Sequence, residues 1–151
     1  MGVRRAVGFA LCVAAQLGIL GCFSSEASPV NGTWKIRDLV LEIFDGQQTV
    51  CGRIVWLKDP QRRPKECGKT IVWGLSPNGT NSWSNGSIYN PTNGKTYRLA
   101  ATLEPGGTLN ARIYKGIPAF GETKILMKVA PRSLDGWCVK PLGAPAHRAH
   151  A

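Results

Sequence analysis

From Asn31 onward, the chain consists of short runs in which apolar and polar residues alternate, without the 3.6-residue period of an amphipathic helix. Turn signals separate these runs. Asn-Gly pairs occur at 31–32, 78–79, 85–86 and 93–94. Both residue types tolerate the positive φ that two-residue hairpin turns require. The pattern therefore predicts a meander of antiparallel strands.

About eight strands are predicted, each with one apolar and one polar face. Their spans are roughly 32–37, 39–45, 48–57, 70–75, 81–89, 95–104, 107–115 and 122–130. One buried and one solvated face per strand is typical of antiparallel barrels and sandwiches. Eight strands close into a barrel just wide enough to be filled by side chains or to hold one small ligand. The predicted class is all-β.

The alternation also predicts which side chains face the barrel interior. In the strand at 48–57, Val50, Ile54 and Trp56 share the predicted inner face. In the last strand the apolar face carries Ile125, Met127 and Val129, with Lys124 and Lys128 on the opposite face.

Residues 1–27 have the layout of a secretory signal peptide. Two arginines precede an apolar run from Ala6 to about Leu20, and small residues follow. The small residues at 25 and 27 fit cleavage before Ser28. The expected location is therefore periplasmic or secreted.

The sequence also contains a second possible cleavage site for this signal peptide. The segment Ile19-Leu-Gly-Cys22 resembles the lipobox of bacterial lipoproteins, in which Cys22 would be lipidated and would anchor the protein in the cell envelope. With either exit, the barrel domain is expected at 28–131. A Pro/Ala-rich tail follows at 132–151.

Export would place the cysteines in an oxidising compartment, where they are disulfide candidates. A Cys51–Cys67 bridge would staple the polar loop between them and contribute about 3 kcal/mol on the loop-entropy model. Pairing of Cys67 with Cys138 is the alternative, and the sequence does not choose between the two. The chain has no Cys-x-x-Cys motif, and its two histidines, His147 and His150, lie in the tail. Neither a metal site nor a cofactor is expected.

The formal net charge of the chain is +10. Without residues 1–27, 17 basic and 8 acidic residues remain, a net charge of +9. This charge favours acidic partners such as anionic lipid head groups or sugar polymers. A basic, soluble exported protein without such a partner is the plainer interpretation. Export and the lack of aromatic residues within a basic strip argue against nucleic-acid binding.

Several motifs carry a resemblance to a known family. They are Gly32-Thr-Trp34, Cys51-Gly-Arg-Ile-Val-Trp56, Ile88-Tyr-Asn-Pro91, Gly94-Lys-Thr-Tyr97 and Phe120-Gly121 followed by Thr123. With these motifs, residues 30 to 130 resemble the bacterial exported domain-of-unknown-function family 2147. The resemblance implies a calycin-like barrel, similar to lipocalins and streptavidin, in the cell envelope. It implies no activity.

The resemblance also implies a structural pair. In lipocalin-like barrels, a basic side chain from the last strand lies across the ring of the first-strand Trp, which is Trp34 here. The family usually has a Trp-x-Arg element in its last strand, where this chain has Leu126-Met127-Lys128. Lys128 would then cover Trp34 through a cation–π contact of roughly 0.5 to 2 kcal/mol. Lysine lacks the planar stacking and forked donors of arginine.

The sequence gives little support to an enzyme. It has no Gly-x-Ser-x-Gly motif and no histidine outside the tail, so no activated nucleophile is evident. Four carboxylates are formally available for acid–base chemistry, those of Glu42, Asp45, Asp59 and Glu104. The last three adjoin a Gly or Pro, so turn formation is their simpler role. We expect no catalytic residues.

A binding role is better supported, because aromatic rings lie on or beside the predicted strands. The candidate ligand-binding residues are Arg53, Trp56, Trp83, Tyr89 and Tyr97. Rings of this kind, with few polar groups, form the usual small-molecule pocket. They also fill the cores of small barrels. The turn between the two tyrosines has a structural role and contains Asn90, Pro91 and Gly94.

Two functions of different classes follow. In the first, the barrel binds a small apolar or anionic ligand inside it or at its mouth. In the second, the protein uses its basic outer surface to contact another envelope protein or an anionic polymer. An internal cavity that opens near Arg53 and Tyr97 would favour the first.

Overall fold

The computed structural model describes residues 26–130 and 136–138 of the chain. The predicted signal segment up to residue 25, including Cys22, lies outside the described residues, as does most of the predicted tail with both histidines.

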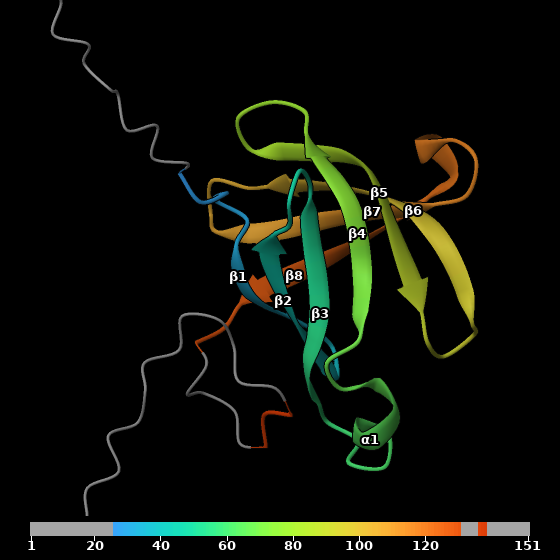
Figure 1. Ribbon diagram of the computed structural model, residues 1–151. Coiled ribbons are helices and arrows are strands. Elements are labelled where there is room, and N and C mark those ends of the chain that lie inside the picture. The colour runs from blue at the N-terminus through green and yellow to red at the C-terminus, as the bar shows by residue number, and fades with distance from the viewer. Residues whose placement is uncertain (1–25, 131–135, 139–151) are drawn as a thin grey trace, which may run out of the picture.

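The described chain forms a closed antiparallel barrel in which eight strands follow one another in sequence order (Figure 1). The strands are β1 (Gly32–Ile36), β2 (Leu39–Asp45), β3 (Val50–Leu57), β4 (Thr70–Pro77), β5 (Ser82–Asn90), β6 (Lys95–Leu103), β7 (Thr108–Tyr114) and β8 (Glu122–Lys128). A short helix, α1 (Arg63–Glu66), lies between β3 and β4, and a 3-10 turn, η1 (Pro118–Phe120), lies between β7 and β8. The predicted all-β barrel of about eight strands is confirmed.

Because successive strands run in opposite directions, their connections alternate between the two ends of the barrel. The open end carries the connections 37–38, 58–69, 91–94 and 115–121. The closed end carries the connections 46–49, 78–81 and 104–107, together with residues 26–31 before β1.

The closed end is filled by large side chains. Trp34 and Val30 are fully buried there, and Trp83 is 3% exposed. The indole Nε1 of Trp34 donates a hydrogen bond to the carbonyl oxygen of Val30, 2.7 Å away, which satisfies the polar atom of the ring inside the core.

The barrel closes where β1 meets β8. Trp34 pairs with Lys128 in this short ladder, and Lys35 pairs with Met127. The Nζ atom of Lys128 lies 5.4 Å from the centre of the Trp34 ring, within cation–π range. Gly32 lies beside this contact with φ at +133°, and a Cβ there would come 3.1 Å from Cε of Lys128. A glycine therefore lets the lysine pass over the tryptophan.

Trp56 does not share the inner face with Ile54, so this part of the prediction was wrong. The pairing of β2 with β3 shifts register between Val40 and Leu41, which lie opposite Trp56 and Ile54 respectively. This bulge leaves Val55 as an extra residue and turns Trp56 to the outer side of the barrel wall. There Trp56 packs in a second apolar cluster with Val40, Val55, Val129 and Trp137.

The predicted faces of the last strand were also reversed. Leu126 is 3% exposed and packs in the core, whereas Ile125 and Met127 are each 63% exposed. Leu126 pairs with Leu109 on β7. Lys124 and Lys128 share its inner face, because long lysine stems can cover apolar surface while their ammonium groups reach the two ends of the barrel.

The disulfide joins Cys67 to Cys138, and Cys51 is a free thiol, so the predicted Cys51–Cys67 bridge was wrong and the alternative pairing was right. Gly68 and Lys69 hydrogen-bond to Ile54, which places Cys67 about three residues along β3 from Cys51. Three strand residues span roughly 10 Å, beyond the reach of a disulfide. The backbone N–H of Cys138 donates to the carbonyl of Val55, 3.0 Å away, and this bond brings Cys138 to Cys67.

Replacing Cys138 with serine should lower the free energy of unfolding by about 4 kcal/mol, because the bridge spans 71 positions and its loss restores the entropy of that loop to the unfolded chain. Urea unfolding of the oxidised proteins measures this change. Cys51→Ser is the matched control and should shift stability by less than about 1 kcal/mol. An equal loss in both variants would contradict the pairing.

Replacing Lys128 with methionine keeps the length of the side chain but removes its charge above Trp34. The loss of the cation–π contact should reduce the free energy of unfolding by about 0.5 to 2 kcal/mol. Lys69→Met, at an exposed position of the open end, provides the comparison and should be nearly neutral in the same thermal or urea melts. If Lys128→Met is as stable as the parent, the cation–π contact does not stabilise the junction between β1 and β8.

Candidate ligand-binding site

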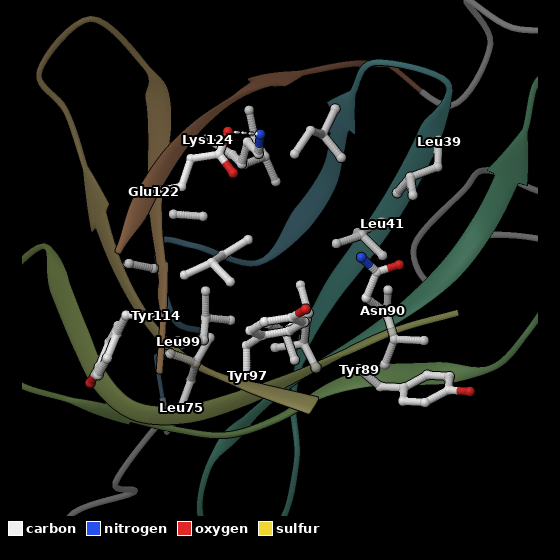
Figure 2. Close-up of a pocket in the computed structure, with 18 of the residues that line it drawn as sticks. Leu39, Leu41, Leu75, Tyr89, Asn90, Tyr97, Leu99, Tyr114, Glu122 and Lys124 are labelled. Atoms are coloured by element: carbon white, nitrogen blue, oxygen red, sulfur yellow. Dashed lines mark hydrogen bonds and ion pairs between the residues drawn. The ribbon is translucent and has the colours of Figure 1, made fainter. Parts of the chain in front are cut away.

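A cavity of about 590 Å³ lies inside the barrel and extends to the open end (Figure 2). This volume falls within the range of small-molecule sites. Its walls are aliphatic side chains from every strand except β3, including Leu41, Ile43, Leu75, Leu99, Leu109 and Leu126.

The cavity has its mouth at one end. Residues in or next to the open-end connections line it, among them Pro91 and Asn93 between β5 and β6 and Phe120 in η1. None of the closed-end connections contributes to its lining. Trp34 and Trp83 are buried in the core near the closed end and are absent from the lining, so they fill the bottom of the barrel.

Polar groups gather at the mouth. Lys124, on the inner face of β8, donates a hydrogen bond to the carboxylate of Glu122, and this partner holds the pKa of Glu122 below its ordinary value. The Lys124 side chain is 23% exposed, whereas that of Glu122 is 69% exposed. A second ammonium group, that of Lys115, lies 5.7 Å from the centre of the Tyr97 ring. The mouth therefore presents two cations and one carboxylate that reaches into solvent.

The hairpin between β5 and β6 positions Tyr97 at this mouth. Asn90 Oδ1 accepts a hydrogen bond from the backbone N–H of Thr92, and Asn93 Oδ1 accepts one from that of Lys95. Gly94, with φ at +67°, donates its N–H to the Asn90 carbonyl 2.9 Å away. These bonds fix the turn, and Asn93 Nδ2 then donates to the hydroxyl of Tyr97 at 2.9 Å.

The structure separates the five predicted ligand-binding residues. Tyr97 and Tyr89 line the cavity, and Figure 2 shows Tyr97 among the lining side chains and Tyr89 at their edge. Arg53, Trp56 and Trp83 do not line it, so the structure does not bring these three candidates together with the two tyrosines at the cavity. Arg53 lies on β3 with its guanidinium 2.8 Å from Glu42 and its charge over the Phe44 ring. The rings of Trp56 and Trp83 serve the outer cluster and the core.

The polar residues of the mouth were not among the candidates predicted from the sequence; they are Lys115, Glu122 and Lys124. One signal could have found Lys124. Side chains two positions apart on a strand point to the same side, so Lys124 shares a face with Leu126. Had Leu126 been predicted to face inward, Lys124 would have been predicted inside the barrel as well.

The four carboxylates considered for acid–base chemistry each have a structural partner. Glu42 pairs with Arg53, and Asp45 accepts hydrogen bonds from Ser28 and Asn31. Asp59 caps the backbone N–H of Gln61, and Glu104 accepts from the Asn110 amide. The described residues contain no group of three or more His, Cys, Asp or Glu side chains that could hold a metal ion.

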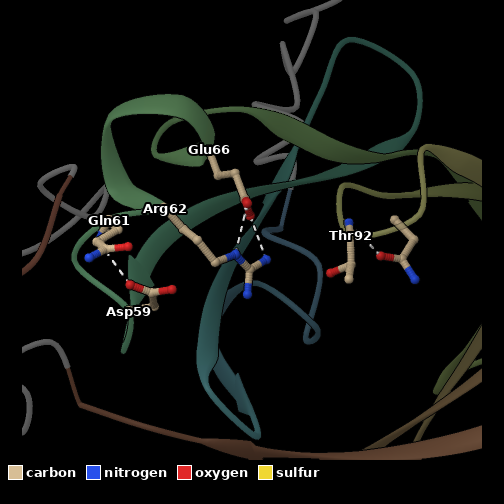
Figure 3. A network of polar contacts seen from close by, with 6 residues as sticks. Asp59, Gln61, Arg62, Glu66 and Thr92 are labelled. Atoms are coloured by element: carbon tan, nitrogen blue, oxygen red, sulfur yellow. Dashed lines mark hydrogen bonds and ion pairs between the residues drawn. The ribbon is translucent and has the colours of Figure 1, made fainter.

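The long connection between β3 and β4 is braced by its own ion pair. Arg62 donates two hydrogen bonds to the carboxylate of Glu66, at 2.8 and 2.7 Å, while Asp59 binds Gln61 (Figure 3). Glu66 raises the pKa of Arg62 above its ordinary value, mainly through this hydrogen bond. Arg63 donates to the carbonyl of Leu57, 2.9 Å away, which ties α1 to the end of β3.

The sequence model of one family, described as "Uncharacterized protein conserved in bacteria (DUF2147)", matches residues 32–128. The chain belongs to this family. The DUF2147 segment begins at the first residue of β1 and ends at the last residue of β8, so it coincides with the barrel. The predicted family is confirmed. None of the curated proteins matches the chain.

Among solved structures, this DUF2147 protein is similar to protein HP1028 from Helicobacter pylori, which is described as belonging to the lipocalin family. The TM-score is 0.56 with 18% sequence identity, and the match covers 66% of this chain and 82% of that one. At this identity, the likeness shows a shared lipocalin-like fold. No helix among the described residues is long and apolar enough to cross a membrane.

Proposed function

We propose that this barrel binds one small amphiphilic molecule, with the apolar part in the cavity and an acidic group at the mouth. The observation that carries this proposal is the cavity itself, about 590 Å³ of space with aliphatic walls and a mouth at the open end. A lipocalin-like fold in an uncharacterised family supports a binding role over a catalytic one. The proposed function is non-enzymatic.

The aliphatic walls favour an apolar ligand body. Each buried CH₂ group contributes about 0.8 kcal/mol, so a chain of eight such groups would contribute roughly 6 kcal/mol before the entropy of association is subtracted. The floor of the cavity offers no charged side chain, because its inner residues there are those of Leu75, Ala101 and Leu109.

The mouth favours an acidic group on that ligand. Lys124 already holds a carboxylate, that of Glu122, at the rim of the cavity. Because Glu122 is largely exposed, it can turn into solvent and regain hydration, while the more buried Lys124 would take the ligand's carboxylate instead. Lys115 would supply a second positive charge.

The place of action is part of the same proposal. The signal-like residues 1–27 support export to the periplasm or beyond, and Cys22 remains the alternative route to a lipid anchor. A ligand of the proposed kind would then come from the cell envelope.

Filling the cavity should weaken ligand binding without unfolding the barrel. Ala111 points into the cavity, so Ala111→Phe should place a ring in the space that the ligand needs and reduce its affinity more than tenfold, roughly the loss of two CH₂ contacts. Fluorescence titration with a fluorescent fatty acid measures the affinity.

The matched control is Ala100→Phe on β6, which pairs with Arg112 beside Ala111 but does not line the cavity. It should leave the titration unchanged. Thermal melts of both variants report folding. Unaltered binding in a folded Ala111→Phe protein would exclude the cavity as the site.

The acidic head group can be tested by comparing the same fluorescent fatty acid with its methyl ester. Lys124→Met should weaken binding of the acid about tenfold and leave that of the ester unchanged, because only the acid pairs with the lysine. Glu122→Gln should strengthen binding of the acid, since the competing carboxylate is gone. Lys95→Met, outside the cavity lining, is the control. Equal losses for acid and ester would contradict the head-group assignment.

A further inference from the structure

The charges of the described residues are distributed unevenly between the two ends of the barrel. The open-end connections 37–38, 58–69, 91–94 and 115–121, together with the adjoining strand residues 95 and 122–124, carry nine basic and four acidic side chains, a net charge of +5. The closed end has Glu26, Asp45 and Glu104 against Lys128 alone, a net charge of −2. The molecule therefore has a positive end, and the cavity opens there.

Two large apolar side chains project from the same end. Phe120 is 84% exposed and Ile117 is 55% exposed, and both belong to the connection between β7 and β8. Phe120 also borders the mouth of the cavity. The remaining large exposed apolar residues, Trp73, Ile125 and Met127, lie on strands of the barrel wall.

This apolar loop is held in position. The guanidinium of Arg112 donates to the carbonyl oxygens of Pro118 and Ala119, at 2.9 and 3.1 Å, and to the hydroxyl of Thr123 at 3.1 Å. Gly121 allows the chain to pass close to β7, since a Cβ at this position would come 2.6 Å from the carbonyl oxygen of Ile113. Arg112 and the close approach at Gly121 thus fix the loop against β7, while its apolar side chains remain outside the core.

A positive surface with projecting apolar side chains matches the chemistry of an anionic lipid bilayer. Basic residues near such a surface each contribute about 1 kcal/mol of attraction, and apolar side chains enter the boundary between head groups and acyl chains. A soluble polyanion would pair with the basic side chains but would offer no apolar environment for an exposed phenylalanine.

We propose that the open end of the barrel docks onto an anionic lipid bilayer, with Phe120 and Ile117 inserted at the head-group boundary and the surrounding basic side chains against the lipid phosphates. The proposal does not require the cavity to be loaded. Docking in this orientation would set the mouth against the lipid, where an amphiphile can enter the barrel without crossing bulk water.

The test is co-sedimentation with vesicles, using the protein as cells produce it, with its N-terminus established by mass spectrometry. Vesicles of phosphatidylglycerol and phosphatidylcholine should bind more protein than vesicles of phosphatidylcholine alone, and the difference should shrink as salt rises. Phe120→Ser and Lys95→Glu should each reduce partitioning to the anionic vesicles roughly tenfold.

Two matched controls change the barrel wall instead. Ile125→Ser removes a similarly exposed apolar side chain, and Arg98→Glu makes the same change in net charge; each should alter partitioning at most about twofold. Equal binding to both vesicle types, or controls that weaken it as much as the loop variants do, would overturn the proposal. So would tight binding to dextran sulfate together with vesicle binding that Phe120→Ser leaves unchanged, since the positive end would then be a polyanion site.

A second readout locates the inserted residue independently of any other attachment. A tryptophan placed by Phe120→Trp should be quenched by lipids brominated near the head group, relative to the parent protein, whereas one placed by Ile125→Trp should not. Quenching of the Ile125→Trp variant alone would place a different face on the membrane and refute the proposed orientation.

Discussion

The closed barrel and its cavity depend on a narrow seam, the contact between β1 and β8. The first strand has only five residues, and it meets β8 at two residue pairs, so a few contacts must hold the ends of the sheet together. Trp34 supplies much of the burial at this point, with Lys128 above its ring. Backbone and side-chain bonds between Thr33 and Val129 extend the seam beyond the ladder. Closure removes the exposed strand edges that would otherwise pair with other chains.

The cavity follows from where large and small side chains lie within the closed sheet. Tryptophan rings occupy the bottom of the barrel, whereas leucine, isoleucine, valine and alanine line the part nearer the mouth. An eight-stranded barrel is about wide enough to be filled by side chains, so inner residues of modest size leave space for a ligand. The same choice of residues that closes one end therefore leaves the other hollow.

Much of the fold could be predicted from alternation and turn residues, because these depend on local chemistry. The motifs around Trp34 and Tyr97 also identified the family. The face of Trp56 could not be predicted, since one bulge opposite Val40 shifts the alternation. The inner face of β8 could not be predicted either, because the exposed residues Ile125 and Met127 on both sides of Leu126 are as apolar as a buried face. Two of the five predicted ligand residues line the cavity, and the charged groups of its mouth emerged only from the arrangement of strands in space.

The disulfide has a consequence for how the chain is connected. The bond between Cys67 and Cys138 makes a covalent ring that contains β4 to β8, while β1 to β3 lie outside the ring and are held by noncovalent contacts. A protease cut within the hairpins at 91–94 or 104–107 would leave both pieces joined. A cut at 46–49 would detach β1 and β2, and with them Trp34, from the rest of the chain. The disulfide therefore protects the barrel against a single chain cut in β4 to β8, but not against a cut in β1 to β3.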